Sequence, residues 1–169
     1  MSSEGVESRM APVSAEAFRH ACGRFATGVA IAAVMDETGV PRGLTVSSFA
    51  SVSLEPPLIL VCLGHAVTNI EQFRRSRYFS LSFLRQEQVY LSNQFARKGH
   101  DRFTEVPWRP GETGAPLILG ALGALECVLY QRFTSGDHDI LVGEVVRAQA
   151  AEGSPLIHYA GSYRRLAEE

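Results

Sequence analysis

The sequence has little excess charge of either sign and no long apolar run. Its 169 residues carry a formal net charge of −2 at pH 7, which gives no electrostatic reason to expect a nucleic acid or an anionic membrane as partner. No apolar stretch approaches the roughly 20 residues that a helix needs to cross a bilayer. Met1 to Met10 is polar and acidic, without the basic and apolar parts of a secretory signal. We therefore expect a cytoplasmic protein.

Cysteine and histidine are also sparse and badly spaced for metal or disulfide chemistry. The three cysteines are far apart, and no Cys-x-x-Cys pair occurs, which argues against a disulfide framework and a zinc site. None of the five histidines stands at metal-ligand spacing from another. The motifs of P-loops, dinucleotide folds and Gly-x-Ser-x-Gly hydrolases are missing. As an enzyme, the chain would need a cofactor for the difficult step, and we expect no metal.

The sequence does contain many short strand-like segments between a few short helices. We predict a flexible leader over residues 1–13 and one domain over residues 14–169. Helices are expected at 14–26, 68–77 and 86–96, strands at 29–35, 42–48, 49–53, 58–63, 78–84, 121–133, 140–150 and 158–166, and a loop at 97–114. This spacing argues against a doubly wound parallel sheet. It predicts a mainly β (α+β) fold, a closed antiparallel barrel with helical decoration.

The segment from Gly43 to Pro57 is the most informative. It contains one threonine and four serines among apolar residues. Every second residue from Ser47 to Ser53 is a serine except Phe49, so a strand here would present one nearly hydroxylated face. Hydroxyls and backbone amides can bond the edge of a flat polar ring without adding charge, while apolar neighbours cover its faces. A solvated face of an antiparallel strand is the alternative interpretation.

Two further places could carry chemistry. Gly136-Asp137-His138 forms the tip of the last long hairpin, where a glycine allows close approach and an imidazole can stack on a ring or bond an amide. An ordinary hairpin turn is the alternative. A second group of polar residues lies at a helix end and in the loop after it: Gln94, Arg97, Lys98 and Arg102. Cations there could meet a phosphate, or simply form a solvated charged segment.

The order of these motifs resembles the flavin reductase family, the small NAD(P)H:flavin oxidoreductases that supply two-component flavin monooxygenases. The resemblance runs from Phe18 to Leu166. It rests on five pieces in sequence: Phe25–Val29, Gly43–Phe49, Ser51–Ser53 with Pro56-Pro57, Asn93–Ala96 followed by Asp101–Phe103, and Gly136–His138. It implies a mainly β flavin-binding split barrel of antiparallel, Greek-key type, with a homodimeric assembly and a site near the subunit interface.

The resemblance also implies a role for each matching residue. The implied cofactor-binding residues are Thr45, Val46, Ser47, Ser48, Ser51, Val52, Ser53, Cys62, Leu63, Ser82, Phe83, Gln94, Lys98, Phe103, His138 and Tyr163. Those of the serine-rich segment would line the ring edge and ribityl side of the flavin, and those from Ser82 to Phe103 would be near the ribityl phosphate or the outer part of the flavin. His138 would be the catalytic residue, beside the nicotinamide. Many family members carry asparagine where this chain has Ser82, whose shorter hydroxyl could still bond a phosphate.

The activity implied is NADH-dependent reduction of free FAD or FMN. A hydride would pass from nicotinamide C4 to flavin N5, and the reduced flavin would leave for a separate oxygenase. This chemistry needs no side-chain acid or base, in keeping with the missing catalytic motifs. No arginine pair can be placed to hold a 2′-phosphate, which favours NADH over NADPH. Two alternatives stay open: an FMN-bound oxidase of the pyridoxamine-phosphate-oxidase-like type, and a non-catalytic flavin-binding barrel.

Overall fold

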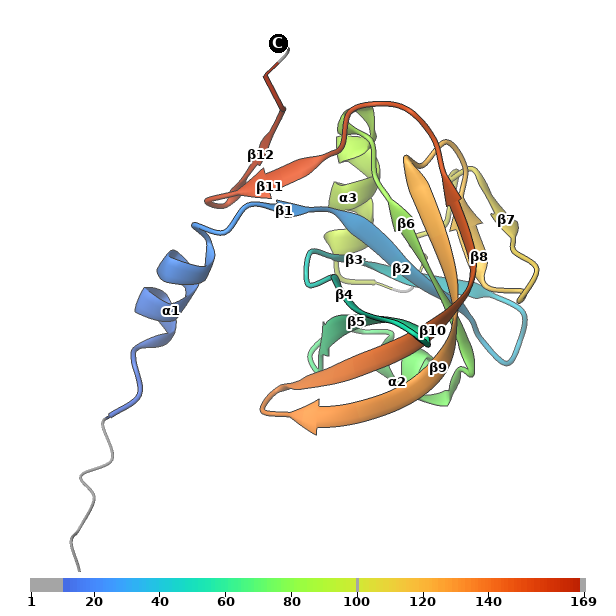
Figure 1. Cartoon of the computed structure of the whole chain (residues 1–169), viewed down its shortest axis with the longest axis horizontal. Coiled ribbons are helices and arrows are strands. Elements are labelled where there is room, and N and C mark those ends of the chain that lie inside the picture. Colours follow the sequence, from blue (N-terminus) through green and yellow to red (C-terminus); the bar gives the residue numbers. More distant parts are fainter. Residues whose placement is uncertain (1–10, 100, 168–169) are drawn as a thin grey trace, which may run out of the picture.

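The structure, a computed structural model, describes residues 11–99 and 101–167. Its centre is a seven-stranded antiparallel sheet in the order β3-β2-β6-β9-β10-β5-β4 (Figure 1). These strands are β2 (Ala30–Met35), β3 (Pro41–Val46), β4 (Ala50–Leu54), β5 (Pro57–Gly64), β6 (Tyr78–Phe83), β9 (Gly123–Ser135) and β10 (His138–Ala150). The sheet curls on itself, because Ser48, just after the edge strand β3, hydrogen bonds Cys62 of β5 near the opposite edge. The predicted antiparallel barrel is confirmed.

The sheet has a core on each side of β2. Alternate residues of a strand point to opposite faces, so Ala32 and Val34 join one cluster and Ile31 and Ala33 the other. The first cluster fills the barrel, with Phe79 of β6 among its largest fully buried side chains. The second lies under α3 (Val89–Ala96). Burial on both faces explains why residues 29–35 read as an unbroken apolar run.

The helices are short and fill gaps around the barrel. In α2 (Ile70–Arg75), Ile70 and Phe73 are buried as predicted. The 3-10 turn η1 (Gln86–Gln88) leads into α3, which buries Leu91 and Phe95. Ser14 caps α1 (Ala15–Cys22) by accepting a hydrogen bond from the Ala17 amide, also as predicted. No residue of α1 is buried, however, and the helix stands away from the barrel (Figure 1).

The long closing hairpin is confirmed, with both arms within two residues of their predicted bounds. Its arms β9 and β10 are joined by Gly136 and Asp137, and Gly136 has a φ of 60°, the positive value expected of such a tight turn. Most residues of the outer half of the hairpin are exposed, and this part projects beyond the barrel (Figure 1). The tip therefore carries His138 to the rim of the molecule.

Three predictions about short elements were wrong. The predicted loop 97–114 contains β7 (Trp108–Pro110), which pairs with β8 (Pro116–Ile118). The predicted strand 158–166 is a hairpin of β11 (Ile157–Tyr159) and β12 (Ser162–Arg164), which joins β1 (Thr27–Gly28) in a separate small sheet. The first helix ends at Cys22 rather than residue 26. Strands of two or three residues are too short to leave a periodic pattern, so only their partners define them.

The predicted leader over residues 1–13 falls mostly on residues 1–10, which lie outside the described residues, as do residues 168 and 169. The division into this leader and one domain over 14–169 stays a prediction. Within the part of the chain that the structure describes, no helix is long and apolar enough to span a membrane.

Candidate functional site

Two of the sequence motifs meet in one pocket. A cavity of about 400 Å³ is lined by residues 25–30, by residues 46–49 and by Phe83. The first segment connects α1 to β2, the second is the end of β3 with the link to β4, and Phe83 ends β6. We call this cavity the motif pocket. It lies beside the gap that separates the two edge strands of the sheet.

Ser48 closes that gap with a single hydroxyl. Its Oγ accepts a hydrogen bond from the Cys62 N–H at 2.9 Å and donates one to the Cys62 carbonyl at 3.0 Å. The neighbouring Ser47 is exposed at the pocket, whereas Val46 is buried in the barrel core. Burial raises the pKa of the Cys62 thiol, which disfavours the thiolate that a nucleophile would need. Of the predicted residues in this stretch, Ser47 is the one most open to a ligand.

Thr27 lines the motif pocket and has a hydroxyl without a hydrogen-bond partner in the described part of the chain. Its Oγ1 is buried, and no hydrogen-bond partner for it exists among the described residues. A buried hydroxyl without a partner loses about 1–3 kcal/mol, so a ligand that bonded it would recover that cost. Sequence reasoning placed Thr27 in a family motif but gave it no role in the site. The sequence could not show that the Thr27 hydroxyl is buried in the same pocket that Ser47 lines.

An aromatic pair forms the apolar wall. Phe49 and Phe83 meet edge to face with their ring centroids 5.0 Å apart. Both also line a neighbouring apolar hollow of about 710 Å³, together with Gly28, Val29 and parts of β9 and β10. At Gly28 an added Cβ would meet nothing within 4 Å. The hollow therefore continues the motif pocket past the two rings and widens the space open to a flat ligand.

The serine-rich segment does not form the single hydroxylated strand face that was predicted. Residues 47–49 are a link between strands, and the pairing of β4 with β5 shifts register between Ser51 and Ser53. Such a bulge turns neighbouring side chains to new directions. Ser51 and Val52 are exposed and Ser53 is half-buried. Because β4 is an edge strand, its outer backbone groups have no neighbouring strand in the described sheet.

His138 lies at the same end of β5 as Ser48. It pairs with Gly64, two residues beyond Cys62, which corresponds to roughly 7 Å along a strand. An added Cβ on Gly64 would lie 3.4 Å from His138 Nε2, so the imidazole rests against the bare backbone of β5. Nδ1 is 2.6 Å from the Asp137 carboxylate, and this hydrogen bond lowers the pKa of Asp137. With a side chain 47% exposed, His138 is free to meet a ligand.

Of the residues predicted for the phosphate end, some make contacts within the fold and others are exposed. Gln94 donates to the carbonyls of Arg102 and Thr104 at 2.9 and 3.0 Å, and Phe103 packs edge-on against Phe95 in the second core. Lys98 is exposed.

Arg102 is buried, donates Nη1 to the Gly43 carbonyl at 2.8 Å, and has no described partner for Nε. Burial lowers the pKa of this guanidinium, so an anion beside it would stabilise its charge.

Thr45 and Tyr163 belong to a hydrogen-bonded row along α3. Thr45 Oγ1 donates to the Ser92 carbonyl at 2.7 Å, and the Ser92 hydroxyl lies 2.8 Å from the Tyr163 hydroxyl. The row ties β3, α3 and β12 together beside the motif pocket. Leu63 is fully buried in the barrel core. None of these three predicted residues lines the motif pocket.

A substitution of Ser82 tests whether this serine binds flavin or only stabilises the fold. It is 1% exposed, and its Oγ accepts a hydrogen bond from the Ile118 N–H at 3.1 Å. We expect Ser82→Ala to lower the free energy of unfolding by about 1–2 kcal/mol, because a buried amide loses its acceptor, and to leave flavin affinity unchanged. Chemical denaturation and a flavin titration measure the two effects. A large loss of flavin affinity with unaltered stability would return Ser82 to the phosphate site.

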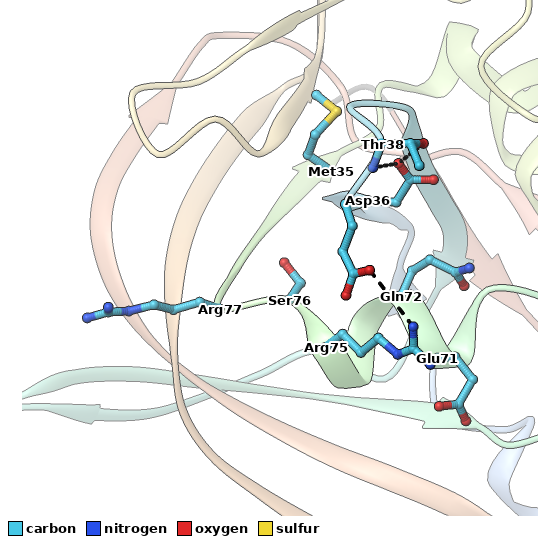
Figure 2. A pocket seen from close by; sticks show the side chains of 9 residues that line it. Met35, Asp36, Thr38, Glu71, Gln72, Arg75, Ser76 and Arg77 are labelled. Carbon is cyan, nitrogen blue, oxygen red and sulfur yellow. Dashed lines mark hydrogen bonds and ion pairs between the residues drawn. The ribbon is translucent and has the colours of Figure 1, made fainter.

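A second polar cavity, of about 430 Å³, lies at the β2–β3 turn and α2. Figure 2 shows its polar side chains, among which Arg77 points away from the others. Several are already paired within the protein: Asp36 with Thr38, Arg75 with Glu37, and Ser76 with the Tyr78 carbonyl. It contains none of the predicted site residues. Over the described part of the chain, no group of three His, Cys, Asp or Glu side chains converges to hold a metal.

An antiparallel barrel with a pocket lined by two of the motifs is the split-barrel class of fold that the sequence resemblance implied. The flavin reductase like domain matches residues 22–167. The chain belongs to this family, and the resemblance seen in the sequence is confirmed.

Individual relatives agree with this assignment. The chain is 39% identical over 145 residues to the reductase component of a flavin-dependent trigonelline monooxygenase from Acinetobacter baylyi, covering 86% of this chain and 47% of that protein. It thus spans about half the length of that relative. It is 36% identical over 156 residues to the FMN reductase (NADH) SmoA of Agrobacterium fabrum, covering 92% of this chain and 88% of the relative.

A solved structure gives the same result in three dimensions. The NADH:FAD oxidoreductase of Streptomyces globisporus, in complex with NAD and FAD fragments, superposes with a TM-score of 0.86 and 36% identity. The match covers 94% of this chain and 98% of that one. The overall fold described above therefore recurs in a protein whose crystals hold NAD and FAD fragments.

Proposed function

We propose that this protein uses NADH to reduce FAD or FMN and releases the reduced flavin to a separate flavin-dependent oxygenase. One observation carries the proposal: two family motifs, distant in sequence, line a single pocket with an aromatic pair on its wall. The names of the relatives support the same reaction class. We also keep the cytoplasm as the proposed location, because reduced nicotinamides are made and consumed there.

The residues present fit a flavin. The orphaned Thr27 hydroxyl and the exposed Ser47 hydroxyl supply polar partners, and the outer edge of β4 supplies backbone amides near Ser51. Phe49 and Phe83 offer an apolar surface for a ring. Arg102, buried beside Gly43 with an unsatisfied Nε, fits the phosphate end. This division of apolar faces and polar edges is what a flat, hydrogen-bonding ring requires.

In this site the protein's own task is alignment. Bound flavin supplies the chemistry, accepting a hydride at N5 from a dihydronicotinamide. Ser48 fixes the link over β5, and the unpaired backbone amides of the edge strand β4 would be the donors available to the edge of a bound ring, where they would stabilise negative charge. His138, resting on Gly64, is placed to orient the nicotinamide. Holding two rings in register converts an encounter into a near-attack geometry, and no side-chain base is needed.

An absorbance assay at the nicotinamide band tests the proposal. Purified protein is mixed with NADH and with FAD, FMN or riboflavin in turn, and the series is repeated with NADPH. We expect rapid oxidation of NADH with at least one flavin and slower oxidation of NADPH, because no arginine pair is placed for a 2′-phosphate. A yellow protein that consumes neither coenzyme would instead support a flavin-binding protein without reductase activity. Retained FMN with turnover of another substrate would support the oxidase alternative.

We further propose that the working form is a homodimer. An eight-residue helix is unstable on its own, yet α1 buries nothing in its own chain and exposes Phe18. Phe25 beside it is 78% exposed, and Leu54 on the edge strand β4 is 90% exposed. A second copy is the occupant that suits these surfaces best. Phe25 also lines the motif pocket, so such a contact would complete the pocket wall.

The dimer proposal makes a direct prediction. We expect Phe18→Asp to shift the protein towards monomer, raising the dissociation constant by roughly tenfold or more, since a charge replaces a large apolar contact. Sedimentation velocity across a concentration series measures the shift. Tyr90→Asp, at an aromatic residue 56% exposed on α3, is the matched control. Equal behaviour of both variants and the parent would contradict a contact through α1.

A further inference from the structure

The outer part of the β9–β10 hairpin carries His138 with very little core beneath it. In residues 130–138 every residue is exposed, and Asp139 is the first buried one that follows. The tip projects beyond the barrel (Figure 1), although β10 stays paired with β5 as far as the His138–Gly64 pair. Outside this backbone pairing the arm has few buried apolar contacts, so its stability depends on the polar contacts of its side chains. Asp139 is the first buried side chain after the tip and the one with polar atoms to anchor the arm.

Asp139 makes a complete set of charged hydrogen bonds. Its Oδ2 accepts from Arg74 Nε at 2.6 Å, and its Oδ1 accepts from His65 Nε2 at 3.0 Å and Thr134 Oγ1 at 2.9 Å. The carboxylate is 1% exposed, and a charge this buried is tolerated only when donors satisfy it. The bond from Arg74, above all, holds the pKa of Asp139 well below its usual range. The ionised group thus joins α2, the β5–α2 connection and β9.

Hydrogen bonds from His65 and Arg132 also hold the hairpin, on either side of Asp139. The His65 N–H donates to the Asp137 carbonyl at 2.9 Å, so His65 holds the hairpin through both its main chain and its ring. Arg132 of β9 donates to the Arg74 carbonyl at 2.9 Å. Because His138 and Asp139 are consecutive strand residues, their side chains point to opposite faces. Fixing Asp139 against α2 therefore holds His138 out on the other face, against Gly64.

We propose that Asp139, together with Arg74 and His65, is a positioning residue that fixes the angle of the hairpin and so keeps the His138 imidazole in its place against Gly64. This rests on the proposed function, since it assigns His138 to the nicotinamide. Asp139 itself touches no ligand: its oxygens are occupied by Arg74, His65 and Thr134 on the far face. Its effect on the reaction must pass through His138.

The experiment uses Asp139→Asn, which keeps the side chain's size and removes its charge. Amide hydrogen exchange of residues 130–138, measured without flavin, reports the anchor directly, and we expect it to rise by about tenfold. With flavin, we expect the KM for NADH to rise by about fivefold or more while the flavin dissociation constant stays unchanged. In a His138→Ala background the same substitution should leave the KM for NADH unaltered, because two residues that act through one contact are not additive.

Asp36→Asn is the matched control. Asp36 also accepts hydrogen bonds from an arginine Nε and a threonine hydroxyl, those of Arg42 and Thr38, but at the β2–β3 turn. It should leave both the hairpin's exchange and the KM for NADH unchanged. Unaltered exchange of residues 130–138 in Asp139→Asn, or an undiminished effect in the His138→Ala background, would overturn the proposal. If the parent protein consumed no NADH, the proposed function would fail, while the exchange measurement would still decide whether Asp139 anchors the hairpin.

Discussion

Replacing His138 with alanine should raise the KM for NADH by about tenfold and lower kcat/KM by on the order of 10- to 100-fold, with flavin affinity nearly unchanged. The reason lies in where the imidazole sits. It rests on Gly64 at the rim of the barrel, about two strand residues from the level of Ser48, while Thr27, Ser47 and the Phe49–Phe83 pair line the motif pocket. A residue at the rim can orient a second ligand without holding the first. Steady-state kinetics with NADH varied, and a separate flavin titration, measure the two effects.

His138→Gln separates the two ways in which the imidazole could act. Glutamine can still bond a carboxamide but cannot stack as a ring, so recovery of the KM in this variant would assign a hydrogen-bonding role. Asp137→Asn is the companion variant: it removes the charge beside Nδ1, 2.6 Å away, and keeps a residue suited to the turn. Equal losses of flavin and NADH affinity in His138→Ala would contradict the assignment of His138 to the nicotinamide.

Elements with a strong local signal could be predicted from the sequence. The apolar run at 29–35 became β2, Ile70 and Phe73 face inward from α2, and Gly136 takes the positive φ expected at its turn. Each depends on residues close together in the chain. The β7–β8 pair could not be predicted in this way, because each strand of three residues exists only through its partner.

The exposure of α1 could not be predicted from the sequence either. Its apolar spacing, with Phe18 and Cys22 one helical turn apart, is what a helix packed on its own barrel would show. The structure leaves every residue of α1 unburied. An amphipathic pattern predicts that the apolar face of a helix will be buried, but not whether it packs against its own chain or against another copy.

The candidate site was predicted at the level of segments better than at the level of single hydroxyls. Ser47 is exposed at the motif pocket, but Thr45, Ser48 and Ser82 all bond backbone groups of the fold. The partner of Ser82 is Ile118, 36 residues along the chain. Which hydroxyls remain for a ligand therefore depends on long-range pairing that no local pattern records. Thr27 shows the converse, since its lack of a partner becomes visible only once the barrel has closed.

The same long-range packing makes Gly143 the most sensitive glycine of the barrel. It lies on β10 beside a register shift in the pairing with β9. A Cβ there would overlap the ring of Phe79 and come within 2.9 Å of the Cys127 Cβ, and both of these side chains are buried in the barrel core. Neither has space to move, because interiors are packed to crystal-like density.

We therefore expect Gly143→Ala to lower the free energy of unfolding by about 3 kcal/mol, as overpacking of a filled core does. For a chain of this size the corresponding fall in melting temperature is roughly 6–12 °C. Differential scanning calorimetry checks the fall, and urea denaturation checks the free energy. Gly28→Ala is the control, because an added Cβ there meets nothing within 4 Å; its melting temperature should stay close to that of the parent. If Gly143→Ala melted no lower than Gly28→Ala, the barrel interior at β6 and β10 would have to be looser than the burial of Phe79 and Cys127 indicates.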